Sequence, residues 1–297
     1  MVAASILGVL AVAPGTAHAA PARTERVLDA RAAAAASFAA DAFFSGTVAP
    51  GGQQHWVWNN AGSNIAFHVG FNPTGASTSA SCRFDLADHW YETLRSGERK
   101  FHFVIRNSGS ISCGATIELS AVGATNVGST GGMNPGETQN LVYVTVDETA
   151  SYLVGLVPSG ATTTNSCQFK VTSVTYARVR SGDVSTPVIL RYTVQNVGSI
   201  TCVAGIEIGS DPVDRILPAV TLAPGAQSSR LWNNANPVSA VHLIAVNPDI
   251  VGCSISITGQ YYRQVINLDG SSERELVFTM RNVGTVTCAG RPMLAKI

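Results

Sequence analysis

The chain has 297 residues, of which 45% are hydrophobic and 13% are charged, so it can fill the cores of two or three modules. Lysine plus arginine equals aspartate plus glutamate, at 19 each. This balance gives the whole chain no electrostatic footprint for nucleic acid or for an anionic membrane surface, and it excludes nucleic acid as an expected partner.

The first 20 residues resemble a secretory signal peptide. An apolar run ends in Ala17-His18-Ala19, the small-x-small pattern after which signal peptidase cuts, although the usual basic start is missing. No later apolar run reaches the ~18 residues that a membrane-spanning helix needs. We therefore expect a secreted protein, extracellular or at the cell surface, with no transmembrane segment.

Residues 21–46 form an Ala-rich leader that does not belong to the repeats described below. Most of its residues favour a helix, and it lacks the alternation of a strand. A short helix, a flexible leader and a strand near Phe43 and Phe44 remain open for this segment.

A turn of the form Asn-x-Gly, followed four residues after the glycine by a cysteine, occurs three times. Each copy follows a run in which apolar and polar residues alternate, as in a half-buried strand. The three copies contain Asn107, Gly109 and Cys113, then Asn196, Gly198 and Cys202, then Asn282, Gly284 and Cys288.

A second set of markers recurs in the same order. A Pro-Gly turn is followed, eight residues after the proline, by an aromatic residue, then by a strand and a cysteine, and nine residues later by a tyrosine. The aromatic residues are Trp58, Tyr143 and Trp232, and the cysteines are Cys82, Cys167 and Cys253. These cysteines lie 85 and 86 residues apart, a length that suits a β-sandwich of about seven strands.

We predict an all-β fold of tandem Ig-like β-sandwich modules. Cutting the chain before the recurring tyrosines gives two whole modules and two partial ones after the signal peptide (1–20) and the leader (21–46). The partial modules are 47–88, with later strands, and 260–297, with earlier strands; the whole modules are 89–173 and 174–259.

The order of strand, Asn-x-Gly-(Ser/Thr), strand, Pro-Gly and three further strands resembles the CARDB type of bacterial Ig-like domain, a cell-adhesion-related β-sandwich. The resemblance covers about residues 89–259 and implies an Ig-like fold, and the cysteines depart from the usual pattern of that family. In an Ig-like sandwich the loops that would carry the two cysteines of a module lie at the same end. This implies the disulfides Cys113–Cys167 and Cys202–Cys253, and it leaves Cys82 and Cys288 in the two partial modules.

A half-sandwich exposes an apolar sheet face, so the two partial modules need partners. Three solutions remain open. The chain closes on itself, with Cys82 and Cys288 as a clasp; or it pairs head to tail with other copies, which builds a filament; or it is a fragment of a longer protein.

We find no local signature of catalysis, a cofactor or a metal site. The densest titratable cluster, Asp85, Asp88 and His89, falls at an expected module junction, where a solvated linker is the ordinary interpretation. Trp58 and Trp232, each followed by asparagines, offer the aromatic and amide groups that bind sugars, although a recurring tryptophan is more often part of a core.

The sequence therefore predicts a secreted, disulfide-containing structural or adhesive protein without enzymatic activity. Its expected partners are other copies of itself or a cell-surface or extracellular glycan or protein. The alternative is an array of carbohydrate-binding modules that uses Trp58 and Trp232.

Overall fold

The computed structural model describes residues 25–28, 41–181, 186–233, 235 and 241–297. The expected signal peptide (1–20) lies outside these residues. In the Ala-rich leader the described parts are two short strands, β1 (Glu25–Leu28) and β2 (Asp41–Phe44). The second of these agrees with one of the three alternatives left open for this segment, a strand near Phe43 and Phe44, and the leader between the two strands lies outside the described residues.

The described residues form an all-β protein, as predicted, and their strands fall into three repeats of five strands each. The three repeats share the order of their strands, the turns between the strands and the pairing of the strands. The first repeat contains β3 (Gln53–Trp58), β4 (Ile65–Thr74), β5 (Cys82–Thr93), β6 (Arg99–Asn107) and β7 (Gly114–Ser129); the second contains β8 (Thr138–Tyr143), β9 (Ala150–Ser159), β10 (Cys167–Arg178), β11 (Val188–Asn196) and β12 (Val203–Pro212); the third contains β15 (Gln227–Trp232), β16 (His242–Pro248), β17 (Ser254–Ile266), β18 (Ser272–Asn282) and β19 (Cys288–Lys296). Two short strands, β13 (Arg215–Ile216) and β14 (Val220–Leu222), precede the third repeat.

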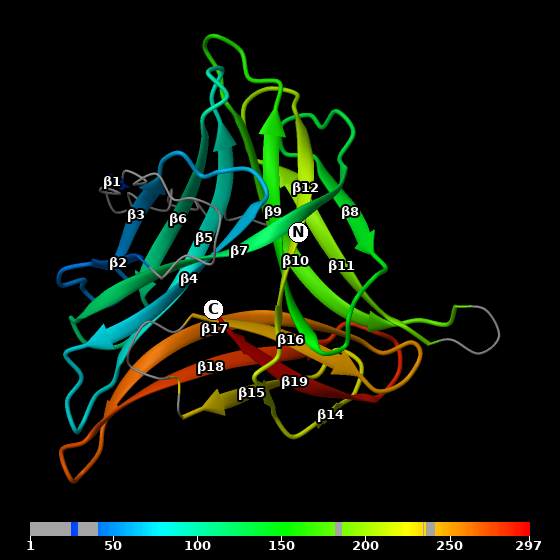
Figure 1. Cartoon of the computed structure of the whole chain (residues 1–297). Helices are drawn as coiled ribbons and strands as arrows, with labels where there is room; N and C mark the ends of the chain where they lie inside the picture. The colour runs from blue at the N-terminus through cyan, green and yellow to red at the C-terminus, as the bar shows by residue number, and fades with distance from the viewer. Residues whose placement is uncertain (1–24, 29–40, 182–185, 234, 236–240) are drawn as a thin grey trace, which may run out of the picture.

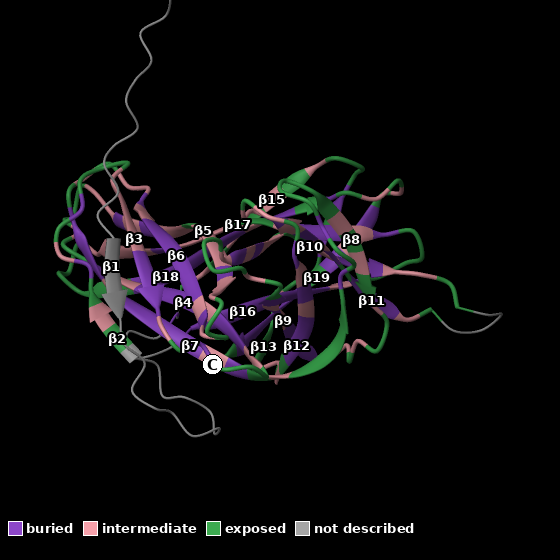
Figure 2. Ribbon diagram, turned by 90° about the horizontal axis from the view of Figure 1, so that it is seen from above, coloured by how far each residue is buried: buried purple, intermediate pink, exposed green. Residues whose placement is uncertain are grey.

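Each repeat consists of two antiparallel layers. In the first repeat β6 pairs with β3 on one side and β5 on the other, while β4 pairs with β7 in the second layer. The other repeats have the same arrangement, β8-β11-β10 over β9-β12 and β15-β18-β17 over β16-β19. The layers bury a continuous apolar core, and Figure 2 shows the buried residues along the strands and many exposed residues in the connecting loops. Five main strands thus form a repeat, rather than the expected seven or so.

The disulfide pairing expected from the Ig-like template is wrong. The bonds are Cys82–Cys113, Cys167–Cys202 and Cys253–Cys288, each inside one repeat. Each bond connects the two layers of a repeat. It joins a cysteine at the start of a strand in one layer, such as β5, to a cysteine at the start of a strand in the other layer, such as β7. The physical reason is that the two layers of a repeat face each other where these strands begin. The Cα atoms of each cysteine pair are therefore 5.8 to 5.9 Å apart, a distance that a disulfide spans.

The expected module boundaries 88/89, 173/174 and 259/260 fall inside the continuous strands β5, β10 and β17. The segments expected to be half-modules are therefore not left unpaired. The strands of 47–88 pair with β6 and β7, and those of 260–297 pair with β15 and β16. Closure by a Cys82–Cys288 clasp does not occur, because each of these cysteines has a partner in its own repeat.

The three repeats nevertheless form a closed ring, in which β5, β10 and β17 meet as a triangle. The end of β5 pairs with the start of β10 (Tyr91 with Phe169), and the end of β10 pairs with the start of β17 (Tyr176 with Ile255). The end of β17 then pairs with the start of β5, so the third repeat joins the first. Figure 1 shows the resulting lobes, with the blue-to-teal first repeat, the green to yellow-green second repeat and the yellow-to-red third repeat around a common centre. The ring has approximate threefold symmetry.

Candidate functional site

A cavity of about 500 Å³ lies at the centre of the ring, where the three repeats meet. One side of the cavity is formed by the middle of the triangle. Residues 86–90 of β5, 170–174 of β10 and 257–260 of β17 pair with no strand of a neighbouring repeat, because three strands cannot pair along their whole length around one point. Each strand also carries a bulge there, at Ala87, Thr172 and Thr258. Bulges bend strands, and these three leave an opening in the sheet.

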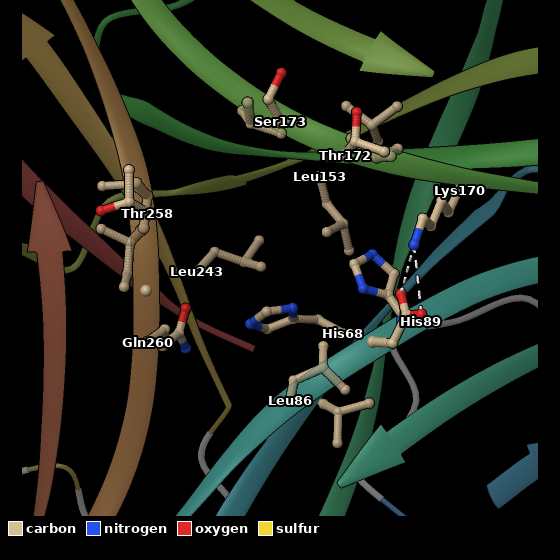
Figure 3. Close-up of a pocket in the computed structure, with 18 of the residues that line it drawn as sticks. His68, Leu86, His89, Leu153, Lys170, Thr172, Ser173, Leu243, Thr258 and Gln260 are labelled. Atoms are coloured by element: carbon tan, nitrogen blue, oxygen red, sulfur yellow. Dashed lines mark hydrogen bonds and ion pairs between the residues drawn. The ribbon is translucent and has the colours of Figure 1, made fainter. Parts of the chain in front are cut away.

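The wall of the cavity comes from equivalent positions of the second layer. His68 of β4, Leu153 of β9 and Leu243 of β16 each lie five residues before the proline that ends or nearly ends the strand, and all three line the cavity. Figure 3 shows these side chains together with Leu86 and His89 around the central space. The lining thus combines aliphatic and aromatic side chains with polar ones from all three repeats, and the two imidazoles form a polar corner on the side of the first repeat.

The strands beneath the cavity approach one another closely. A Cβ atom on Gly155 of β9 would lie 3.2 Å from the Cβ of Ala66 in β4, and one on Gly70 of β4 would lie 3.0 Å from a methyl carbon of Val241. Glycine at these positions allows this close approach. The floor of the cavity is therefore closely packed, and we take the gap in the triangle as its mouth.

Two imidazoles form the polar corner, and burial keeps both of them neutral at physiological pH. Burial lowers the pKa of His68 to about 4, the nearby His89 adds to this shift, and the backbone of His242 opposes it. Burial likewise lowers the pKa of His89, against the attraction of Asp88. The Nε2 atom of His68 is buried and has no hydrogen-bond partner among the described residues.

The charged groups nearest to this corner are already paired. Lys170 contacts Asp88 across the first and second repeats, with Nζ 3.3 and 3.4 Å from the two carboxylate oxygens. Asp85 instead accepts two hydrogen bonds from the guanidinium of Arg106, at 3.0 and 2.7 Å. The cluster of Asp85, Asp88 and His89 therefore does not act as one group, and it lies within strand β5 rather than in the expected linker.

The asparagines of the recurring turns are structural. Asn107, Asn196 and Asn282 are buried, and each uses its whole amide. The Nδ2 atom of Asn107 donates to the carbonyls of Val48 and Ile111, both at 2.8 Å, and its Oδ1 accepts from the backbone of Gly109 at 2.9 Å. Asn196 with Gly198 and Asn282 with Gly284 repeat this pattern. These residues fasten the turn to the chain that precedes each Pro-Gly turn.

The two tryptophans considered for sugar binding do not form a common surface. Trp58 is only 6% exposed, and its ring lies 6.1 Å from that of Phe43, so it belongs to the core. Trp232 is half-buried, and the guanidinium of Arg215 lies over its ring at 5.6 Å. The structure places neither ring at the central cavity.

A second polar cluster, on the layer β3-β6-β5 of the first repeat, contains two stacked histidines. A hydrogen bond of 3.1 Å joins His55 to His102, and His102 contacts Glu92 at 2.9 Å. The indole of Trp90 stacks on both imidazoles. The hydrogen bond from His102 is the largest of the effects that lower the pKa of Glu92, to about 2. The two imidazoles and the carboxylate of Glu92 are thus hydrogen-bonded to one another, while the buried Nε1 atom of Trp90 has no hydrogen-bond partner among the described residues.

One set of possible metal ligands occurs among the described residues, Asp249 with Cys253 and Cys288. These two cysteines form a disulfide, so their sulfur atoms are not available to a metal. Within the same residues, no helix has the length and apolarity to cross a bilayer.

Sequence reasoning missed His68 and the cavity. The available signal was a departure within the repeats, because His68 stands where the other two repeats have Leu153 and Leu243. Comparison with family models, curated proteins and solved structures found no significant match to this chain.

Proposed function

We propose that the protein acts outside the cell as a non-catalytic binding protein, which holds a small and mainly apolar molecule in the cavity at the centre of its ring. The observation that carries this proposal is the cavity itself, which all three repeats line and which opens through the gap between β5, β10 and β17. Its volume, about 500 Å³, lies within the range of pockets that bind small molecules.

The three disulfides and the N-terminal sequence support a secreted and stable protein. Three disulfides are stable in an oxidising compartment, and the apolar N-terminal run with Ala17-His18-Ala19 is typical of an exported chain. The two-layered repeats with their Asn-x-Gly and Pro-Gly turns favour an Ig-like origin of the CARDB type. A structural or adhesive role at a cell surface is compatible with ligand binding, and we propose it as the setting of this activity.

Assembly into filaments receives less support. Head-to-tail pairing was one of three alternatives, and it followed only from taking residues 47–88 and 260–297 as incomplete modules. Both segments pair within the chain. The described part of the fold therefore supplies no unpaired half-module that would recruit a second copy.

The neutral fluorescent probe N-phenyl-1-naphthylamine tests the proposal, because its emission rises when it leaves water for an apolar site. We expect saturable binding of one probe per chain. Replacing Leu153, on the wall, or Thr258, at the exposed mouth, by tryptophan is expected to weaken binding about tenfold or more, while Val142→Trp, at an exposed site of β8, leaves it unchanged. Two blocking sites keep the test usable if one variant fails to fold.

Circular dichroism of each variant establishes that the fold is retained. Absence of saturable binding in the unaltered protein would overturn the proposal. So would equal binding by the folded Leu153→Trp and Thr258→Trp variants, because the probe would then occupy another surface.

A further inference from the structure

The two imidazoles of the cavity have unused hydrogen-bonding capacity. Among the described residues, the Nε2 atom of His68 has no hydrogen-bond partner, and the hydrogen bond of His89 comes from its backbone rather than from its ring. Buried polar groups are normally paired, and an unpaired one costs about 1 to 3 kcal/mol. The polar corner is therefore matched to a polar group that the protein itself does not provide.

The surrounding charges decide what kind of polar group fits. Lys170 is already compensated by Asp88, and burial disfavours the charged form of both imidazoles. Among the described residues that line the cavity, a carboxylate would find no free cation and an ammonium would find no free anion. Because burying an uncompensated charge is far more costly than burying a hydrogen-bonded neutral group, the corner favours an uncharged ligand.

We propose that the cavity binds an uncharged molecule with an apolar body and a hydroxyl group, a phenol or an alcohol, whose hydroxyl lies against His68 and His89. A neutral imidazole has one donor and one acceptor nitrogen, and a hydroxyl group both donates and accepts, so the two match in either tautomer. This inference rests on the proposed function and specifies the class of ligand.

The symmetry of the ring supports the orientation of such a ligand. The equivalents of His68 are Leu153 and Leu243, and those of His89, seven residues after the first cysteine of each repeat, are Val174 and Gln260. Both imidazoles thus come from the first repeat, while at these two positions the other repeats present three aliphatic side chains and the amide of Gln260. The hydroxyl would point to the first repeat and the apolar body to the other two.

The test compares three ligands of nearly the same body, namely 1-naphthol, naphthalene and 1-naphthoate, through their displacement of N-phenyl-1-naphthylamine near neutral pH. The unaltered protein is expected to bind 1-naphthol about tenfold more tightly than naphthalene, which corresponds to one net hydrogen bond, and more tightly than 1-naphthoate. His68→Leu and His89→Val introduce the residues that the other repeats carry at these positions. Each variant should reduce the preference for 1-naphthol to about twofold or less, and retain binding of naphthalene.

His55→Ser is the matched control, because it removes an imidazole outside the cavity and introduces the residue of the third repeat at that position. It should keep the preference for 1-naphthol. Equal binding of naphthol and naphthalene by the unaltered protein would overturn the hydroxyl inference while the proposed function stands. Tightest binding of 1-naphthoate would overturn the uncharged character. Failure of every probe to bind would overturn both proposals, and His89→Val carries the test if His68→Leu fails to fold.

Discussion

Arg274 of the third repeat forms an ion pair with Glu118 of the first repeat, with Nη2 2.8 Å from the carboxylate, and both side chains are almost completely buried, at 2% and 3% exposure. Its Nε atom also donates to the carbonyl of Phe71, at 2.6 Å. The ion pair therefore joins the last repeat to the first.

The same contact occurs between the first and second repeats, where Arg99 lies 3.2 Å from Glu207. At the third junction the equivalent positions, eight residues before the turn asparagine and five after the second cysteine, are Val188 and Met293. Both are buried. The junction between the second and third repeats thus has apolar side chains at the positions where the other two junctions have a buried ion pair. This equivalence supports a cyclic arrangement of the repeats.

Arg274→Val is expected to lower the free energy of unfolding by about 3 to 5 kcal/mol, because it removes the ion pair of the buried carboxylate of Glu118 with Arg274. The double variant Arg274→Val with Glu118→Met introduces the residues of the apolar junction and should recover most of this loss. Urea unfolding measures both. Lys100→Ala, which removes a more exposed ion pair with Glu98, should change stability by less than about 1 kcal/mol. Equal losses in the single and double variants would contradict this interpretation of the junction.

Peptide mapping without reduction should find Cys82 with Cys113, Cys167 with Cys202 and Cys253 with Cys288. Replacing both members of one pair by serine is expected to lower the free energy of unfolding by about 3 to 4 kcal/mol, because loops of 31 to 35 residues lose their cross-link in the unfolded state. A peptide that joins Cys113 to Cys167 would contradict the fold of the repeats.

Stability should fall as the pH falls from about 6.5 to about 4. Burial lowers the pKa of His242 from 6.5 to about 4, and Arg274, Lys296 and His68 add to the shift. The unfolded chain therefore binds a proton that the folded protein does not, and a contribution of about 3 kcal/mol, present above the unfolded pKa, is lost across this range. His68 titrates in the same direction.

The matched variant for this prediction is His242→Phe, since Phe67 occupies the equivalent position in the first repeat. Urea unfolding between pH 7 and pH 4 should show a shallower loss of stability in the variant. An unchanged slope would mean that His242 does not titrate as its burial indicates.

Trp58→Ala should lower the free energy of unfolding by about 3 to 5 kcal/mol, because it opens a cavity in the core. Trp58→Phe should keep the fold and leave any signal on a glycan array unchanged, since the ring faces Phe43 rather than solvent. A glycan signal that disappears in a stable Trp58→Phe variant would restore the carbohydrate-binding alternative.

The strands and turns were largely predictable because local chemistry determines them. Alternating apolar residues gave the strand before Asn107, and the Pro-Gly pair at Pro50 placed a turn in which Gly51 has a positive φ of 72°. The phase of the repeats was not predictable in this way. A periodic sequence can be cut at several places, and the cut before Tyr91 separated Cys82 from its partner Cys113.

The cavity depends on contacts between residues far apart in the chain. His68, Lys170 and Gln260 come together only because the third repeat pairs with the first. No local pattern encodes that closure. A comparison of equivalent positions would nevertheless have singled out His68, as a polar residue at a position where both other repeats carry leucine.

The most direct test of the central claim is a titration of protein with ¹⁵N-labelled histidine by 1-naphthol, followed through the ring nitrogens in NMR spectra. His68→Leu and His89→Val assign the two cavity signals. We expect the ring signals of His68 and His89 to shift until one ligand is bound per chain, while those of His55 and His102 stay in place. Unchanged His68 and His89 signals, or shifts confined to His55 and His102, would contradict a ligand site at the centre of the ring.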